Sequence, residues 1–132
     1  MQAAQYALQG FLQAFSQFRV DEMMVWWVED ATAFFPVEHQ RERLNGKIAI
    51  HSGFEQLIRH VRAEGKTQLV IVAEDLQEQE SGDMSVITFH LRGDPLCRRT
   101  FVLRRVNDQW RIVHLHASNA PLTLTDRLVH HP

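Results

Sequence analysis

The sequence predicts a single α+β domain in which helices come first and an antiparallel sheet follows. In the first half of the chain, apolar residues recur every three or four positions, which is the period of a helix with one buried face. After residue 66 the period changes to two, the period of a strand. A chain of 132 residues has the length of one domain, so we expect residues 1–132 to form it, with 121–132 as a loosely held tail.

We expect the helices to lie before residue 66. The first spans about residues 2–18, and its apolar stripe consists of Ala4, Ala7, Leu8, Phe11, Leu12, Phe15 and Phe18. Asp21 is expected to cap a short second helix that includes the pair of tryptophans after it. A third helix begins after Gly46 and ends at Gly65, and Gly53 is expected to weaken or split it.

The strands follow the change of period, apart from one earlier strand. This earlier strand, ATAFF, ends at Pro36, whose nitrogen cannot donate to a sheet, and a polar loop follows over residues 37–45. The later strands are expected within residues 67–80, 83–92, 97–106 and 109–118. The turns between them are Ser81-Gly82-Asp83, Gly93-Asp94-Pro95 and Asn107-Asp108. Since short connections make neighbouring strands antiparallel, these strands form a meander with the helices on one face.

The two faces of the last strand differ in composition. One face carries Val113, Leu115 and Ala117, and the other carries Trp110, Ile112, His114, His116 and Ser118. With a hairpin turn at Asn107-Asp108, the first face gains Arg98, Thr100 and Val102, and the second gains Arg99, Phe101, Leu103 and Arg105. We expect the helices to cover the first face, which leaves the second face too apolar for water. We therefore predict a homodimer that packs sheet against sheet through Trp110, His114, His116, Phe101 and Leu103, with Arg105 near Trp110 as a cation–π pair.

Composition argues against several classes of partner. The formal net charge of −2 supplies no strong positive field, so neither nucleic acid nor an anionic membrane is an expected partner. No apolar run approaches the roughly 18 residues of a membrane span, and the first residues lack the order of a signal peptide, so a cytoplasmic protein is expected. The single cysteine, Cys97, forms no internal disulfide and is expected to be inert.

His114 and His116 lie two residues apart, so strand geometry sends both to one face. They could be metal ligands, a catalytic acid and base, or packed side chains. A zinc site needs three or four ligands, and the spacing selects no third ligand among His51, His90 and Cys97. We favour packed, hydrogen-bonded side chains at the dimer interface, and we expect no metal and no cofactor.

The order of these segments resembles a known superfamily. TAFFP, the helix start at Gly46 and the final pattern W-x-I-V-H-x-H-x-S-x-A-P are similar to the nuclear transport factor 2-like (NTF2-like) superfamily, which includes ketosteroid isomerase and the SnoaL-like proteins. The resemblance is closest to the association domain of calcium/calmodulin-dependent protein kinase II and its bacterial relatives, and it covers residues 4–121. It implies a curved sheet wrapped around the first helix in a cone, with a pocket between sheet and helices.

The resemblance does not extend to the residues that carry steroid-isomerase chemistry. The position of the general-base Asp of the isomerases is Phe35 here, and the position of their oxyanion-hole Tyr is Phe11. Their second oxyanion-hole acid falls near Val102, in a segment without a carboxylate. We therefore expect no isomerase of that kind and assign no catalytic residue.

The association domains also carry pocket arginines. One of them falls at Ala117 in this sequence and a second falls near Phe101. Arg98 and Arg99 lie close to that second position, and a shift of one residue would bring either of them into the pocket. Arg98 in the pocket could hold a carboxylate, since guanidinium binds a carboxylate through two parallel hydrogen bonds.

Two functional hypotheses follow. The favoured one is a non-enzymatic module that binds a small, mostly hydrophobic molecule or assembles through its dimer. Its ligand-binding residues are expected to be Phe11, Trp27, Phe35, Arg98, Thr100, Val113, Leu115, Ala117 and Asn119. The alternative is a small isomerase, dehydratase or hydrolase with His51 or His90 as base and Arg98 and Asn119 as electrophilic groups. The two differ in whether a titratable side chain reaches the pocket.

Overall fold

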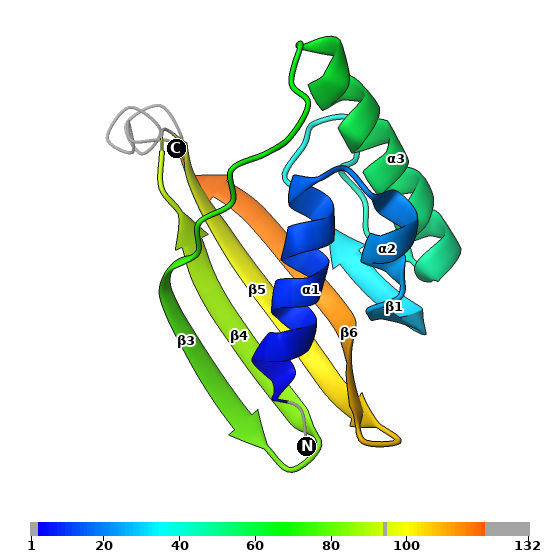
Figure 1. The fold of residues 1–132 in the computed structure, drawn as a ribbon, viewed down its shortest axis with the longest axis vertical. Coiled ribbons are helices and arrows are strands. Elements are labelled where there is room, and N and C mark those ends of the chain that lie inside the picture. The colour runs from blue at the N-terminus through cyan, green and yellow to red at the C-terminus, as the bar shows by residue number, and fades with distance from the viewer. Residues whose placement is uncertain (1–2, 94, 121–132) are drawn as a thin grey trace, which may run out of the picture.

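The computed structural model describes residues 3–93 and 95–120, and it confirms the predicted α+β class (Figure 1). The helices are α1 (Ala4–Ser16), α2 (Val20–Met24) and α3 (Lys47–Ala63). The strands are β1 (Trp27–Phe34), β2 (Leu44–Asn45), β3 (Glu74–Ser81), β4 (Met84–Leu91), β5 (Leu96–Val106) and β6 (Gln109–Ala120). They form one sheet in the order β2-β1-β6-β5-β4-β3, in which β1 runs parallel to β6 and the other neighbours are antiparallel. The predicted tail and Asp94 of one predicted turn lie outside the described residues.

Helix α1 lies across one face of the sheet, with α2 and α3 beside it (Figure 1). We call this the inner face of the sheet and the opposite side the outer face. The apolar stripe of α1 is buried, as its period predicts, through Ala4, Ala7, Leu8, Phe11 and Ala14. Among the described residues, no helix is long and apolar enough to cross a membrane.

Three local predictions about the helices were wrong. The N-cap of α2 is Arg19, and Asp21 lies in the first turn, where a carboxylate favours the helix dipole without capping it. This helix also ends before the pair of tryptophans. Helix α3 is continuous through Gly53. A Cβ at this position would lie 2.8 Å from Leu44 and 3.0 Å from Phe35. The glycine therefore allows close packing of the helix on its neighbours rather than splitting it.

The segment before β3 is extended but unpaired in the sheet. A strand was expected from residue 67, whereas β3 begins at Glu74. The Leu69 amide donates to the Ser16 carbonyl at 2.9 Å, so the segment is held by the end of α1 rather than by β4. Leu69 packs against the core, while Val70 is 87% exposed. The alternation of a strand is therefore kept without its sheet partner.

Strand β6 contains a bulge at Val113. Leu103 of β5 pairs with Ile112, whereas the preceding Val102 pairs with His114, so Val113 is an extra residue on β6. Because side chains alternate along a strand, one extra residue reverses which side chains face the helices. Ile112 and Leu115 are consequently both buried, although their positions differ by an odd number.

The bulge overturns part of the predicted face assignment. Trp110, Phe101 and Leu103 were expected on the outer face, but they belong to the core, with exposed fractions of 3%, 2% and 0%. Leu115 and Ala117 are buried as expected, yet they pair with Phe101 and Arg99 instead of with Thr100 and Arg98. The predicted contact of Arg105 with Trp110 is confirmed within the chain, at 5.6 Å from the guanidinium carbon to the ring.

Candidate ligand-binding cavity

A cavity of about 250 Å³ lies between the helices and the inner face of the sheet. Its walls include Phe11 and Phe15 of α1, Leu57 and Val61 of α3, and Phe89, Phe101 and Leu115 of the sheet. Residues 69–71, from the unpaired segment before β3, close one side. Such a concave, mostly apolar space with few polar groups is typical of small-molecule sites.

Phe11 is the centre of the aromatic wall. Its ring lies 5.5 Å from Trp27, 5.6 Å from Phe54, 5.7 Å from Phe101 and 5.9 Å from Phe15, measured between centroids. These distances and their tilted or edge-on orientations are favourable for aromatic pairs. The wall is therefore built from mutually supporting rings.

Arg99 is the only charged residue in the described lining of the cavity. Its Nη1 donates to the Arg98 carbonyl at 3.0 Å, to the Ser118 carbonyl at 3.3 Å and to Asn119 Oδ1 at 3.5 Å. All three acceptors are neutral. Within residues 3–93 and 95–120, no carboxylate forms an ion pair with Arg99.

Burial shapes the electrostatics of Arg99. Desolvation lowers the pKa of its guanidinium from the ordinary value, and the nearby Cys97 thiol acts in the opposite direction. Arginine remains protonated at neutral pH, so the cavity contains a partly desolvated positive charge. A buried charge of this kind is stabilised by an anionic partner.

The apolar residues predicted for the pocket fall into two groups. Phe11 and Leu115 line the cavity. Trp27, Phe35 and Ala117 are buried in the core, where Trp27 packs on Phe11 and Phe35 lies 4.7 Å from Phe54. Val113 was expected in the lining, but it lies at the bulge of β6 and is absent from the cavity wall.

The polar residues predicted for the pocket are mostly elsewhere. Arg98 and Thr100 were expected to face it, but they lie on the outer face, because Arg99 and Phe101 alternate with them and face inward. Asn119 is exposed and connects the cavity arginine to the loop, since its Nδ2 donates to the Pro36 carbonyl at 3.4 Å. Sequence reasoning missed one signal. The apolar residues Phe101 and Leu103 mark the face of β5 that points inward, and Arg99 lies on that same face.

The histidines proposed as catalytic bases do not reach the cavity. His51 lies on α3, where Nε2 is 3.2 Å from Asp21 and Nδ1 is 3.7 Å from Glu55. His90 lies on the outer face of β4 and borders a different hollow. In the described part of the chain, the cavity lining includes no His, Asp, Glu or Lys.

The histidine pair of β6 lies on the outer face. His114 Nδ1 and Thr32 Oγ1 are 2.7 Å apart, and the Phe34 ring lies 5.9 Å from His114 and 5.1 Å from His116. Burial is the main reason that the pKa of His114 is lowered, the charge of His116 lowers it further, and the contact with Thr32 opposes the shift. No cluster of three or more metal-ligating side chains occurs among the described residues.

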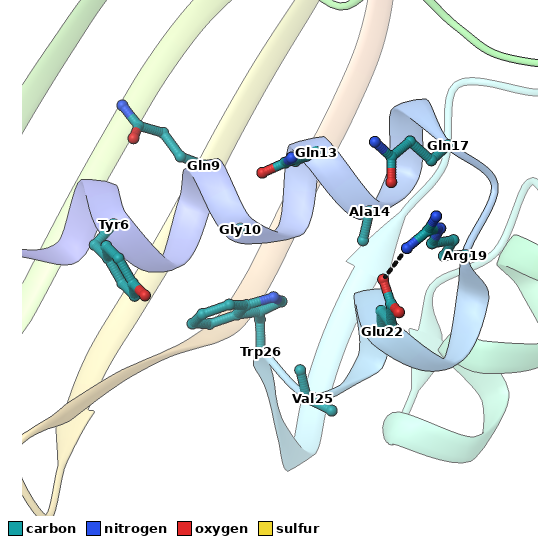
Figure 2. A pocket seen from close by; sticks show the side chains of 10 residues that line it. All are labelled: Tyr6, Gln9, Gly10, Gln13, Ala14, Gln17, Arg19, Glu22, Val25 and Trp26. Atoms are coloured by element: carbon teal, nitrogen blue, oxygen red, sulfur yellow. Dashed lines mark ion pairs between the residues drawn. The ribbon is translucent and has the colours of Figure 1, made fainter.

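A second hollow, of about 480 Å³, lies on the far side of α1 (Figure 2). The Trp26 indole packs directly on Gly10, where a Cβ would lie 2.3 Å from the ring. Tyr6 meets the indole edge-on at 5.8 Å, and Arg111 lies 5.6 Å from the ring centroid. This groove is open and separated from the cavity by α1, and sequence reasoning did not single it out.

The helices, the sheet and the apolar cavity between them define an NTF2-like α+β protein. The sequence profile of the SnoaL-like domain matches residues 5–123, and the chain belongs to that family. A comparison with curated proteins gave no significant match.

Solved structures agree with this assignment. A proposed calcium/calmodulin-dependent protein kinase type II association domain from Thiobacillus denitrificans ATCC 25259 is 29% identical, with a TM-score of 0.69 over 90% of this chain and 94% of that one. An NTF2-like protein of unknown function from Pseudomonas putida KT2440 is 20% identical, with a TM-score of 0.72 over 86% and 82%. A proposed NTF2-like dehydratase from Streptomyces avermitilis is 16% identical, with a TM-score of 0.72 over 88% and 92%. The last two likenesses concern the fold alone.

Proposed function

We propose that this chain binds a small amphipathic carboxylate, whose apolar body occupies the cavity and whose carboxylate contacts Arg99. The observation that carries the proposal is the charge of Arg99 at an apolar cavity, with neutral acceptors as its partners among the described residues. A carboxylate would supply the missing negative charge and accept two parallel hydrogen bonds from the guanidinium.

The size of the cavity limits the ligand. Its volume of about 250 Å³ lies below the roughly 300–1,000 Å³ typical of sites for drug-sized molecules. Phe11, Phe89 and Phe101 present aromatic surfaces to the ligand. Aryl-substituted and short branched monocarboxylic acids therefore fit both the volume and the chemistry of the site.

Binding is better supported than catalysis. Relatives by fold include a proposed dehydratase, and that reaction needs an acid or a base beside the reacting atoms. In this chain the described lining offers Arg99 but no group that titrates near neutral pH. His51 and His90 lie on other surfaces, which removes the support for the enzymatic alternative.

Titration with phenylacetate tests the proposal, with phenylacetamide as the neutral analogue of matched shape. We expect saturable binding of the acid, measured by calorimetry, and an Arg99→Gln variant that loses about 10- to 100-fold in affinity, as expected for a hydrogen bond to a charged group. Arg98→Gln is the matched control and should bind like the wild type. Equal binding of acid and amide, or an unchanged Arg99→Gln variant, would contradict the proposal.

We also propose that the chain forms a homodimer through the outer face, with a composition that differs from the sequence-based expectation. Phe34, His114, His116 and Val102 replace the buried Trp110, Phe101 and Leu103 as interface side chains. Phe34, Val102 and His114 are half-buried and His116 is exposed. Aromatic and aliphatic groups of this kind are suited to an isologous interface.

Light scattering coupled to size-exclusion chromatography tests the dimer over a range of concentrations. Phe34→Glu places a charge between two histidines and should shift the mass toward the monomer. Val70→Glu adds the same charge at a site that is 87% exposed on the other side of the sheet, and it should leave the mass unchanged. A wild-type monomer at every concentration would contradict this part of the proposal.

A further inference from the structure

A polar hollow of about 190 Å³ lies on the outer face, over β3, β4 and β5. Its side chains include Asp75, Gln77, Thr88, His90, Arg98 and Thr100. We propose that it is a second binding site, for a small tetrahedral oxyanion of the phosphate type. The hollow opens on the outer face, whereas the carboxylate cavity lies on the inner face, and Phe89 and Arg99 border both. The hollow lies beside the proposed dimer interface, because Thr100 pairs with His116.

The register of the sheet brings four hydrogen-bonding side chains together. His90 pairs directly with Arg98, and Thr88 pairs directly with Thr100, so the four occupy adjacent positions on one face. Directly opposed residues have Cβ atoms about 4.5–5.5 Å apart. A guanidinium, two hydroxyls and an imidazole therefore surround a space the size of a small anion.

The Arg98 guanidinium is oriented by one hydrogen bond, and its other donors have no acceptor among the described residues. Its Nε donates to Ser118 Oγ at 3.2 Å, which fixes the direction of the guanidinium. Among the described residues, its two terminal nitrogens form no hydrogen bond, and no carboxylate forms an ion pair with it. The two terminal nitrogens of a guanidinium can donate parallel hydrogen bonds to two oxygens of a phosphate.

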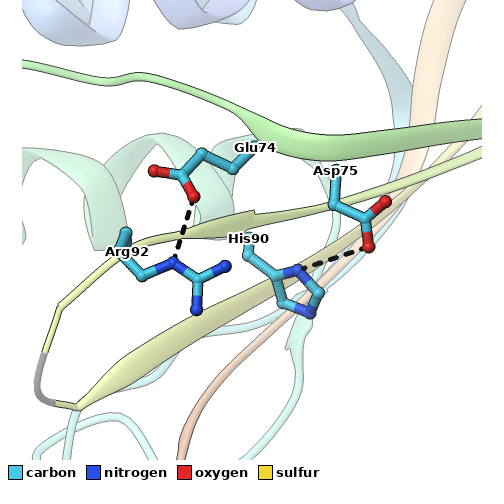
Figure 3. Close-up of polar contacts among 4 residues, drawn as sticks. All are labelled: Glu74, Asp75, His90 and Arg92. Carbon is cyan, nitrogen blue, oxygen red and sulfur yellow. Dashed lines mark hydrogen bonds and ion pairs between the residues drawn. The ribbon is translucent and has the colours of Figure 1, made fainter.

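His90 has a ring nitrogen without a hydrogen-bond partner among the described residues. Its Nδ1 is buried and makes no hydrogen bond within the described part of the chain, and its nearest acid, Asp75 Oδ2, is 3.9 Å away (Figure 3). That distance is beyond hydrogen-bond length. A buried polar atom without a partner indicates that a water or an ion completes the site.

The balance of charge favours an anion over a cation. Asp75 is the one acid in this lining, whereas Arg98 and Arg99 both border it. The neighbouring Glu74 is already paired with Arg92, 3.0 Å away (Figure 3). Asp75 has φ of 52° where the pairing of β3 is irregular, a conformation that Asp tolerates better than most residues and that brings its carboxylate toward His90.

The experiment is a titration of the full chain with inorganic phosphate at constant ionic strength, followed by the backbone amide signals of β4 and β5. We expect saturable shifts at Thr88, Arg98 and Thr100. Arg98→Gln should weaken the binding at least tenfold and Asp75→Asn should tighten it severalfold. Arg104→Gln, on the same strand but outside the hollow, should change it less than threefold. Phenyl phosphate in place of phosphate distinguishes a phosphomonoester from the free anion as the preferred form, and either one bears out the site.

Three results would overturn the site. One is the absence of saturable shifts when chloride is exchanged for phosphate, and another is an Arg98→Gln variant that binds like the wild type. The third is acetate binding as tightly as phosphate, because a planar carboxylate would then satisfy the same donors. Arg98 borders the hollow but not the cavity, so Arg98→Gln should weaken phosphate binding and leave carboxylate binding unchanged. The two proposals can therefore fail separately.

Discussion

Replacing Gly10 by alanine should have opposite effects on stability in two backgrounds. A Cβ at this position would lie 2.3 Å, 2.5 Å and 3.0 Å from three atoms of the Trp26 ring (Figure 2). Favourable contacts between carbon atoms lie at about 3.5–4.0 Å, so the indole must move by about an ångström. It is confined by Tyr6 on one side and Arg111 on another, which makes that movement costly.

Two effects compete in this substitution. Alanine is more favourable than glycine inside a helix by about 1 kcal/mol. Overpacking a well-packed contact costs about 1–3 kcal/mol. We therefore expect Gly10→Ala to lower the free energy of unfolding of the wild type by up to about 2 kcal/mol. In a Trp26→Ala background the clash is absent, and the same change should raise the stability by about 0.5–1 kcal/mol.

Urea denaturation of the four members of this double-mutant cycle measures the coupling between the two sites. Gln13→Ala, on the same helix and beside the same groove, is the control and should change the stability by less than about 0.5 kcal/mol. If Gly10→Ala stabilised the wild type as much as it stabilised the Trp26→Ala variant, the argument from close packing would be wrong.

Further predictions concern the stability that His114, Trp27 and Phe11 contribute. Because the pKa of folded His114 is lowered, chiefly by burial, its stabilising contribution is complete above the ordinary pKa of about 6.5 and is lost as the pH falls through the folded-state value. Unfolding at pH 7.5 and 5.5 should therefore show lower stability at pH 5.5, with a smaller difference in His114→Gln. Trp27 Nε1 is buried without a partner among the described residues, so Trp27→Phe should cost less than about 1.5 kcal/mol, whereas Phe11→Ala should cost about 3–5 kcal/mol. Equal losses for these two variants in thermal unfolding would contradict that comparison.

The elements that sequence predicted well are those whose periodicity is enforced by burial along their whole length. Helix α1 presents a continuous apolar stripe, and its observed bounds lie within two residues of the expected ones. The segment before β3 was predicted poorly because its residues alternate in burial as in a strand, but it pairs with no neighbouring strand among the described residues. Val70 and its neighbours have the composition of a strand, but the Leu69 amide donates its hydrogen bond to the end of α1 and not to a neighbouring strand. Such a tertiary contact leaves no trace in a local pattern.

The cavity was predicted in kind but not in its polar residue. The family resemblance implied a pocket between helices and sheet, and two of the apolar residues expected there, Phe11 and Leu115, line the cavity. The extra residue at Val113 changed the pairing of β6 with β5, so extrapolation from the hairpin turn placed Arg98 opposite Ala117. In the structure, Ala117 pairs with Arg99 instead. A bulge adds one residue without changing composition, and the pattern of apolar residues on β6 alone cannot locate it.

The pair Arg98 and Arg99 illustrates how one strand can serve two surfaces of different polarity. Consecutive residues on β5 point to opposite faces, so two identical side chains enter environments set by their neighbours. Arg99 shares its face with Phe101 and Leu103, and its charge is partly desolvated there. Arg98 shares its face with Thr100 and lies across from His90, where polar groups and water remain available.

This alternation also accounts for the two anion sites that we propose on a chain with a net charge of −2. Net charge governs long-range attraction, whereas affinity for a small anion depends on donors within hydrogen-bond reach and on the local exclusion of water. Arg98→Gln should therefore weaken phosphate binding alone, and the double variant, Arg98→Gln with Arg99→Gln, should weaken the binding of both anions. If Arg98→Gln also weakened carboxylate binding, the two faces would be coupled through β5 and the sites could not be independent.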